Sequence, residues 1–193
     1  MKSTIYTCWQ LLLLVLAFTA NAQKMHTTKW ESGMLDRRTK VGVWEYYGVT
    51  PSQEKVVVQR YDHSVKELLY YRPVSNSIYS IEVSPGQWTR RAVDRPPLFI
   101  GGDAALAAYT TQLQYPEQAQ ERRIQGQVTV GFVVDTLGHT AAHRVLRGIG
   151  GGCDQEALRV AKTVPNEWIP AQLGAKAVPV EYELTLTFRL AQP

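Results

Sequence analysis

Two segments in the last third of the chain alternate apolar and polar residues strictly, and this alternation limits the fold more than any other feature. The first runs from Gln127 to Asp135 and the second from Val178 to Phe188. A period of two places successive side chains on opposite faces of a strand, so each segment predicts a strand with one buried face. The apolar positions are Val128, Val130, Phe132 and Val134 in the first segment, and Val178, Val180, Tyr182, Leu184, Leu186 and Phe188 in the second.

Three segments around these strands carry helix signals. Asp103 is a candidate N-cap for a helix through Tyr109, and Pro116 suits the first turn of a second helix. The stretch 154–164 has apolar residues at helical spacing, and Pro165 ends it. Strands with one buried face and flanking helices predict an α+β fold, in which a two-layer C-terminal domain has a small antiparallel sheet covered by helices on one face.

A glycine-rich segment, 148–152, separates a predicted strand from the helix at 154–164. Strand, glycines and helix in this order also occur at dinucleotide-binding turns. Here Cys153 occupies the last glycine position of that pattern, and the preceding strand follows the turn 135–138 as the second arm of a hairpin. We therefore expect these glycines to allow a tight turn and close helix packing, and we expect Cys153 to be a small buried residue.

Residues 24–93 differ from the rest of the chain because they are rich in Tyr and Trp. Short strand-like runs at 41–47, 55–61 and 65–71 are separated by turn-forming residues. This pattern predicts a small all-β meander before a C-terminal domain at 99–190.

The element Gly42-x-Trp44-x-x-Tyr47 resembles the β-hairpin repeats of the MORN type. The simpler interpretation is that large aromatic residues fill the core of a small sheet. The dipeptide Pro96-Pro97 disfavours regular structure and marks the boundary between the two regions.

The first 22 residues have the pattern of an export signal. Lys2 precedes an apolar core from Leu11 to Phe18, and Ala20-Asn21-Ala22 is a small-x-small cleavage pattern. We expect a cleavable signal peptide at residues 1–22 and a periplasmic protein. The alternative is an uncleaved anchor that holds the protein in the inner membrane, facing the periplasm.

Charge and motif content disfavour several classes of function. The net charge of +4 is spread along the chain, which does not favour nucleic acid as a partner. His139 and His143 would lie about 13 Å apart on one strand face, too far to bind one metal ion together. The sequence contains no catalytic constellation, so we expect a protein that is not an enzyme and has no cofactor and no metal.

The C-terminal half resembles the C-terminal domain family of TonB, in the variant of Bacteroidetes-type bacteria. The resemblance is carried, in order along the chain, by Phe99-x-Gly101-Gly102, Tyr115-Pro116 with Ala119, the 126–135 strand with Gly138, Val145-Leu146, the 148–154 glycine segment, Trp168-x-Pro170 and the closing Val-x-Tyr-x-Leu-x-Leu-x-Phe run. It covers 99–190, about half the chain.

Membership in this family implies a function in energy-coupled transport. Domains of the family capture an extended segment of an outer-membrane transporter, the TonB box, as an added strand on the sheet edge. The resemblance implies two candidate contact regions: the final strand, with Val178, Val180, Tyr182, Leu184, Leu186 and Phe188, and the segment Gln114, Tyr115 and Pro116. Alternatively, Tyr115 packs only beneath the first helix. Pro179 suits an edge strand because its missing N–H would be lost from a central one.

The resemblance implies an outer-membrane TonB-dependent transporter as partner. An inner-membrane proton-driven motor would be a second partner if the N-terminus were retained. A structural or accessory envelope protein that transmits no force is the alternative function, because the long spacer of full transducers is absent. A long edge strand would also allow two copies of the chain to form a homodimer by strand pairing.

Overall fold

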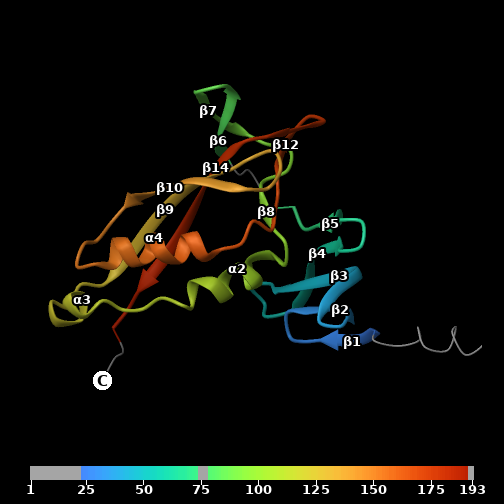
Figure 1. Ribbon diagram of the computed structural model, residues 1–193, viewed down its shortest axis with the longest axis horizontal. Helices are drawn as coiled ribbons and strands as arrows, with labels where there is room; N and C mark the ends of the chain where they lie inside the picture. The colour runs from blue at the N-terminus through green and yellow to red at the C-terminus, as the bar shows by residue number, and fades with distance from the viewer. Residues whose placement is uncertain (1–22, 74–77, 191–193) are drawn as a thin grey trace, which may run out of the picture.

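The computed structural model describes residues 23–73 and 78–190 (Figure 1). The expected signal peptide, 1–22, lies outside the described residues. These described residues form two five-stranded antiparallel sheets and two short strand pairs, with three helices between and beside the large sheets. The predicted α+β class, with an all-β N-terminal meander, is confirmed.

The N-terminal sheet is a meander in which each strand pairs with the next one along the chain. Trp44, Tyr46 and Tyr61 form its buried core, and Gly33 lies flat against the Trp44 indole, where a side chain would clash. These three aromatic residues therefore fill a core, whereas Trp30 and Tyr70 of the same region are exposed. The strands are β1 (Gln23–Thr27), β2 (Glu31–Asp36), β3 (Thr39–Val49), β4 (Lys55–Asp62) and β5 (Glu67–Tyr71).

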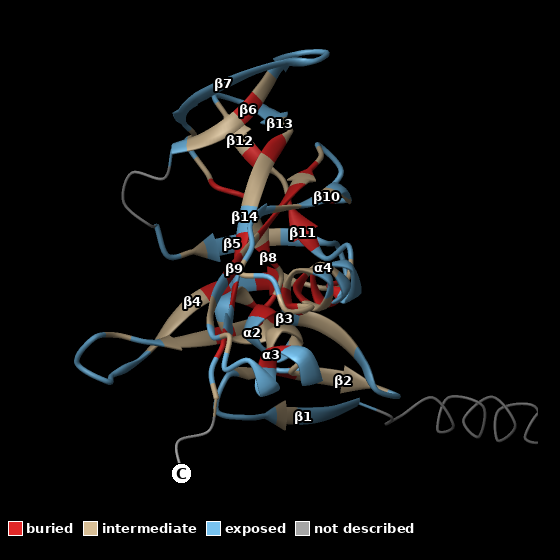
Figure 2. Ribbon diagram, turned by 90° about the vertical axis from the view of Figure 1, so that its left-hand side faces the viewer, coloured by how far each residue is buried: buried red, intermediate tan, exposed pale blue. Residues whose placement is uncertain are grey.

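The C-terminal sheet has the strand order β10-β9-β14-β6-β7, and every pairing in it is antiparallel. The apolar faces of β9 and β14 are buried against the helices, as the alternation predicts (Figure 2). The strands are β6 (Ile78–Ser84), β7 (Gln87–Ala92), β9 (Gly126–Val134), β10 (Thr140–Arg147) and β14 (Val180–Phe188).

The hairpin β6–β7 lies within the 24–93 region of the sequence analysis, but it pairs with the C-terminal sheet. Val180 and Glu181 of β14 face Ile81 and Ser80 of β6. Ile81 is fully buried in the C-terminal core. Burial of this side chain accounts for the pairing of the hairpin with the C-terminal sheet instead of the N-terminal one. The hairpin projects from the top of the molecule in Figure 1.

The helices are α2 (Gly102–Thr110), α3 (Glu117–Glu121) and α4 (Cys153–Thr163). The prediction that Asp103 caps α2 is wrong, because the N-cap is Gly101 and no side chain caps the helix. Gly101 has a φ of 104°, a conformation that glycine adopts without strain, so the chain turns two residues earlier than expected. Asp103 instead lies in the first turn of the helix.

Two short strand pairs join the sheets. These are β8 (Leu98–Phe99) with β11 (Trp168–Ile169), and β12 (Ala171–Leu173) with β13 (Lys176–Val178). The final strand, expected to run from Val178 to Phe188 without a break, divides at Pro179, and Val178 ends β13. Between the sheets, the buried Gln59 donates from Nε2 to the Phe99 carbonyl and accepts from the Gly101 N–H.

Candidate functional site

One side of β14 is open along most of its length. On one side, β14 pairs with β9 from Val180 to Phe188. On the other side, β6 pairs only with Val180 and Glu181. In the part of the chain that the structure describes, no strand pairs with the stretch 182–188 on that second side.

The direction of the backbone groups on this open edge follows from Pro179. Its carbonyl accepts a hydrogen bond from the Glu82 N–H, at 3.0 Å, and therefore faces β6. Because the backbone groups of a strand alternate in direction, the residues two, four, six and eight positions further on face the same side. Beyond the residue that β6 covers, Glu183, Thr185 and Thr187 present N–H and C=O groups to the open edge.

The apolar side chains of β14 hold the strand and do not reach its edge. Leu184, Leu186 and Phe188 are buried in the core, and the Tyr182 ring lies 4.8 Å from the Trp168 ring between centroids. Burial raises the pKa of Tyr182 to about 12. Several residues expected to bind peptide therefore have side chains that already pack in the core. Val180 and Val178 are among them.

Glu183, Thr185 and Thr187 complete the open edge, and the sequence analysis did not select them. Their side chains are exposed on the face of the sheet opposite the helices. The alternation that predicted the strand also contained this signal, because the polar positions face solvent. The sequence alone does not show whether the apolar or the polar positions of β14 direct their N–H and C=O groups toward the open edge. That depends on the pairing with β6, which the sequence did not reveal.

The segment Gln114–Pro116 lies next to the C-terminal end of β14. The Tyr115 ring meets the Phe188 ring edge-on at 5.7 Å, and its hydroxyl donates to the Ile124 carbonyl at 2.7 Å. The Gln114 N–H donates to Glu156 Oε1. The Tyr115 side chain therefore packs on the core at the C-terminal end of β14, and a backbone hydrogen bond to α4 holds Gln114.

The glycine-rich segment surrounds a carboxylate of the protein itself. Asp154 Oδ1 accepts from the N–H groups of Ile149 and Gly150, at 2.8 and 3.2 Å. Gly151 lies against Ala119 and Ile124, where a Cβ would crowd α3. The expectation of close packing is confirmed. The Asp154 carboxylate already accepts from the N–H groups that a phosphate would need, and its negative charge would repel a phosphate.

Cys153 is fully buried and has no disulfide partner among the described residues. Burial raises the pKa of its thiol, which lowers the fraction of reactive thiolate. The prediction of a small buried residue is confirmed.

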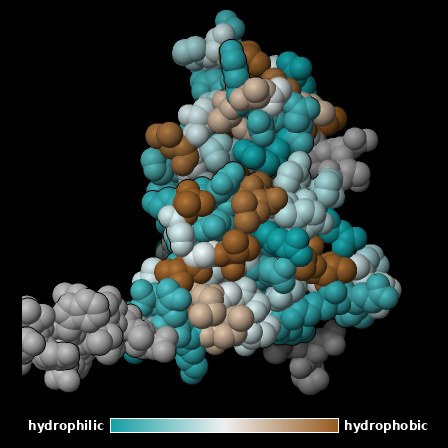
Figure 3. Space-filling model, turned by 90° about the vertical axis from the view of Figure 1, so that its right-hand side faces the viewer, coloured by the Kyte–Doolittle hydropathy of each residue, from teal (hydrophilic) through white to brown (hydrophobic). Residues whose placement is uncertain are grey.

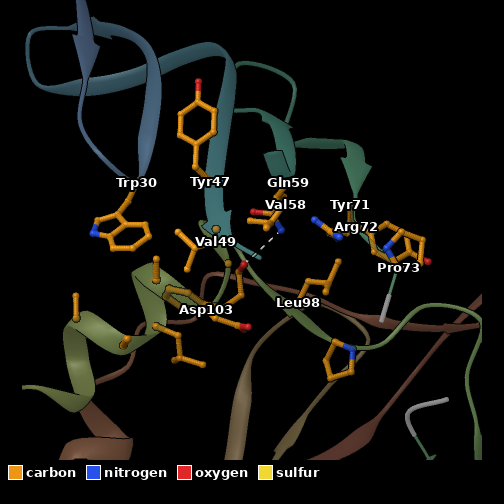
Figure 4. A pocket seen from close by; sticks show the side chains of 18 of the residues that line it. Trp30, Tyr47, Val49, Val58, Gln59, Tyr71, Arg72, Pro73, Leu98 and Asp103 are labelled. Carbon is orange, nitrogen blue, oxygen red and sulfur yellow. Dashed lines mark hydrogen bonds between the residues drawn. The ribbon is translucent and has the colours of Figure 1, made fainter. Parts of the chain in front are cut away.

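A cavity of about 780 Å³ lies between the N-terminal sheet and α2 (Figure 4). Trp30, Tyr47 and Val58 form the wall on the side of the sheet. Leu106 and Ala107 of α2 face them, and Leu98, Phe99 and Tyr182 line the space between. The sequence analysis did not predict this cavity, because its walls come from segments far apart in the chain.

The described residues contain no group of three His, Cys, Asp or Glu side chains that could hold a metal ion. Over the same residues, no helix combines the length and apolarity needed to cross a membrane.

On the side of the N-terminal sheet, apolar side chains form separate patches between polar ones (Figure 3).

Comparison with known proteins identifies the C-terminal region. Residues 111–190, from the end of α2 to the end of β14, match the sequence model of the family described as Gram-negative bacterial TonB protein C-terminal. No curated protein and no solved structure matched the chain. Domains of this family are periplasmic, transport-associated and not enzymes. The region that contains β9, β10, α4 and β14 is therefore a domain of the TonB C-terminal family.

Proposed function

We propose that this protein is a periplasmic binding module that captures an extended peptide of an outer-membrane TonB-dependent transporter by adding it as a strand to β14. The observation that carries the proposal is the side of β14 from Tyr182 to Phe188 with which no strand of residues 23–73 or 78–190 pairs. Backbone hydrogen bonds give such an edge affinity for an incoming strand with little dependence on side chains. Membership of residues 111–190 in the TonB C-terminal family supports this class of partner.

The core supports a rigid receiving edge. Leu184, Leu186 and Phe188 anchor β14 from below, and β9 holds it along its other side. A peptide would therefore meet backbone groups already fixed in an extended conformation, which reduces the entropy lost on binding.

The accessory role without force transmission is the second candidate. The N-terminal sheet supports it, because this folded module packs against the C-terminal half through Leu98, Ile100 and Ile169. A module held in this way would be a second docking element, whereas a transducer needs a long reach. Recovery of the mature protein from soluble periplasm with Gln23 at its N-terminus would favour this candidate, and recovery of Met1 in the inner membrane would favour energy transduction.

Substitution of Thr185 by proline tests the open edge. Its N–H faces the open side, so Thr185→Pro removes one donor from the edge and leaves the β9 ladder intact. We expect binding of synthetic peptides from transporter N-termini to weaken about tenfold, as calorimetry would measure.

Thr185→Val is the matched control, because it keeps the N–H group and the branched shape, and we expect it to bind like the wild type. Thermal unfolding of both variants separates loss of binding from loss of fold. Equal affinity of a folded Thr185→Pro variant and the wild type would contradict the proposal.

A further inference from the structure

The cavity between the N-terminal sheet and α2 has the properties of a ligand site. Its volume, about 780 Å³, falls within the usual range for small-molecule sites, about 300–1,000 Å³, and therefore leaves ample room for one large side chain. Aromatic and aliphatic side chains line most of it. Several lining residues are exposed, among them Arg72, Asp103 and Ala107, so the cavity opens to solvent.

The cavity adjoins the end of the open edge of β14. Tyr182 lines the cavity and is also the first residue of β14 beyond the reach of β6. A strand added to β14 cannot continue to Glu181, because Ser80 of β6 already faces that residue. A peptide that reaches Tyr182 must therefore leave the sheet at this corner, where the cavity is the adjacent apolar space.

Two charged residues of opposite sign line the cavity. Neither the Arg72 guanidinium nor the Asp103 carboxylate forms an ion pair or a side-chain hydrogen bond within the described part of the chain. An anionic lipid or a free phosphate would find Asp103 repulsive. A peptide fits both groups, because its carbonyls accept from a guanidinium and its N–H groups donate to a carboxylate.

We propose that this cavity receives a large apolar side chain from the partner peptide, contributed by the residues that follow the strand added to β14. The inference rests on the proposed function. Every pairing in the C-terminal sheet is antiparallel. An added strand that is likewise antiparallel to β14 brings its C-terminal end to Tyr182. The cavity then selects among peptides that the backbone contacts of the edge cannot distinguish.

The first experiment examines the cavity without strand addition. N-acetyl-phenylalanine amide carries one aromatic side chain, amide donors and acceptors, and no strand. We expect it to shift the Trp30 indole N–H resonance of the full chain at millimolar concentration. Ala107→Trp, at an exposed position of α2 that lines the cavity, should weaken this binding at least about tenfold by filling the space.

Two further variants keep the test decisive. Ala141→Trp is the matched control, because Ala141 is exposed on β10 at the far edge of the sheet, and it should bind like the wild type. Asp103→Asn preserves the size of the side chain and should weaken binding about threefold by removing the charged acceptor. No binding to the wild type, or equal binding to the wild type and the Ala107→Trp variant, would overturn the proposal.

The second experiment separates this inference from the proposed function. A strand-adding peptide is lengthened at its C-terminal end by a segment that contains Phe. We expect about tenfold tighter binding to the wild type and to Ala141→Trp, and no gain in Ala107→Trp. If Thr185→Pro weakens the short peptide but the longer one gains nothing, the cavity inference fails and strand addition stands. If no peptide binds while N-acetyl-phenylalanine amide still does, the proposed function fails.

Discussion

The two sheets of this protein bury very different cores. The C-terminal core is broad and mainly aliphatic, from Val128 on β9 to Phe188 on β14. The N-terminal core consists of Trp44, Tyr46 and Tyr61, and it is completed by Ile169 of β11. The C-terminal sheet thus has a core of its own, whereas the N-terminal sheet depends on a residue from the other half. We infer that the N-terminal sheet is the less independent folding unit.

Loss of Trp44 should have the largest effect on this difference. The side chain is fully buried, lies on Gly33 and donates to the Met34 carbonyl. Trp44→Ala should destabilise the N-terminal sheet by about 3–5 kcal/mol. Hydrogen exchange should then show lost protection in β2–β4 and retained protection in β9 and β14. Equal loss in both sheets would show that they unfold as one unit.

Ile169→Ala should act across the boundary between the halves. Ile169 lies in the C-terminal half of the chain but packs in the N-terminal core. We expect a loss of about 2–4 kcal/mol, detected mainly as faster exchange in the N-terminal strands. Ile100→Ala is a suitable comparison, because Ile100 packs against the same core while only partly buried and should cost less. A loss confined to β9 and β14 would contradict the dependence proposed here.

Gly138→Ala examines the C-terminal sheet alone. Gly138 has a φ of 82° at the turn between β9 and β10, and an added Cβ would strike the Trp168 carbonyl. We expect a cost of about 1–3 kcal/mol from backbone strain and displacement of β11. Chemical denaturation measures this loss. Gly174→Ala serves as the control, because it has a φ of 60° but open space around the Cβ, so the difference between them isolates the contact.

Acidification should produce the smallest effect, in both halves. Burial lowers the pKa of His63 and of His143, and the nearby cations Lys40 and Lys162 lower these pKa values further. A histidine with a folded pKa below its unfolded value, about 6.5, takes up protons preferentially in the unfolded state. The stability that the neutral forms of these two histidines contribute is therefore fully present above about pH 6.5. It declines as the pH falls from there toward the folded pKa values.

The melting temperature at pH 7.5 and pH 5.0 measures this decline. His63 is hydrogen-bonded to the Tyr46 hydroxyl at 2.6 Å, with Lys40, Glu31 and Asp62 nearby. Gln at position 63 can keep this hydrogen bond without titrating, so His63→Gln should make the decline shallower in the N-terminal sheet. An unchanged decline would assign the effect to other groups.

The local pattern of the sequence predicted individual elements well. Alternation located β9 and β14 and identified their buried faces, because an apolar face must be covered whatever covers it. Helical spacing and Pro165 located α4, and the glycines before it pack as expected. These features depend on neighbours within a few residues, which is why the sequence was sufficient.

Long-range pairing was not predictable in the same way. Nothing local shows that Ser80 faces Glu181, or that Leu98 pairs with Ile169. Consequently the transfer of the β6–β7 hairpin, the division of the final strand at Pro179 and the inter-sheet cavity were all missed. The candidate edge was selected as a strand, but its outward-facing backbone became clear only once β6 was placed.

The unequal pairing of β14 on its two sides has a mechanical consequence. β14 matches β9 at nine positions but β6 at only two. Tension transmitted along a strand attached to β14 would load the β9 hydrogen bonds together, in shear, so that none can yield alone. Tension applied through the β6–β7 hairpin would instead separate the two paired positions between β6 and β14 one after the other. The same sheet would thus resist a pull delivered through a bound partner and yield readily to one delivered through its own hairpin.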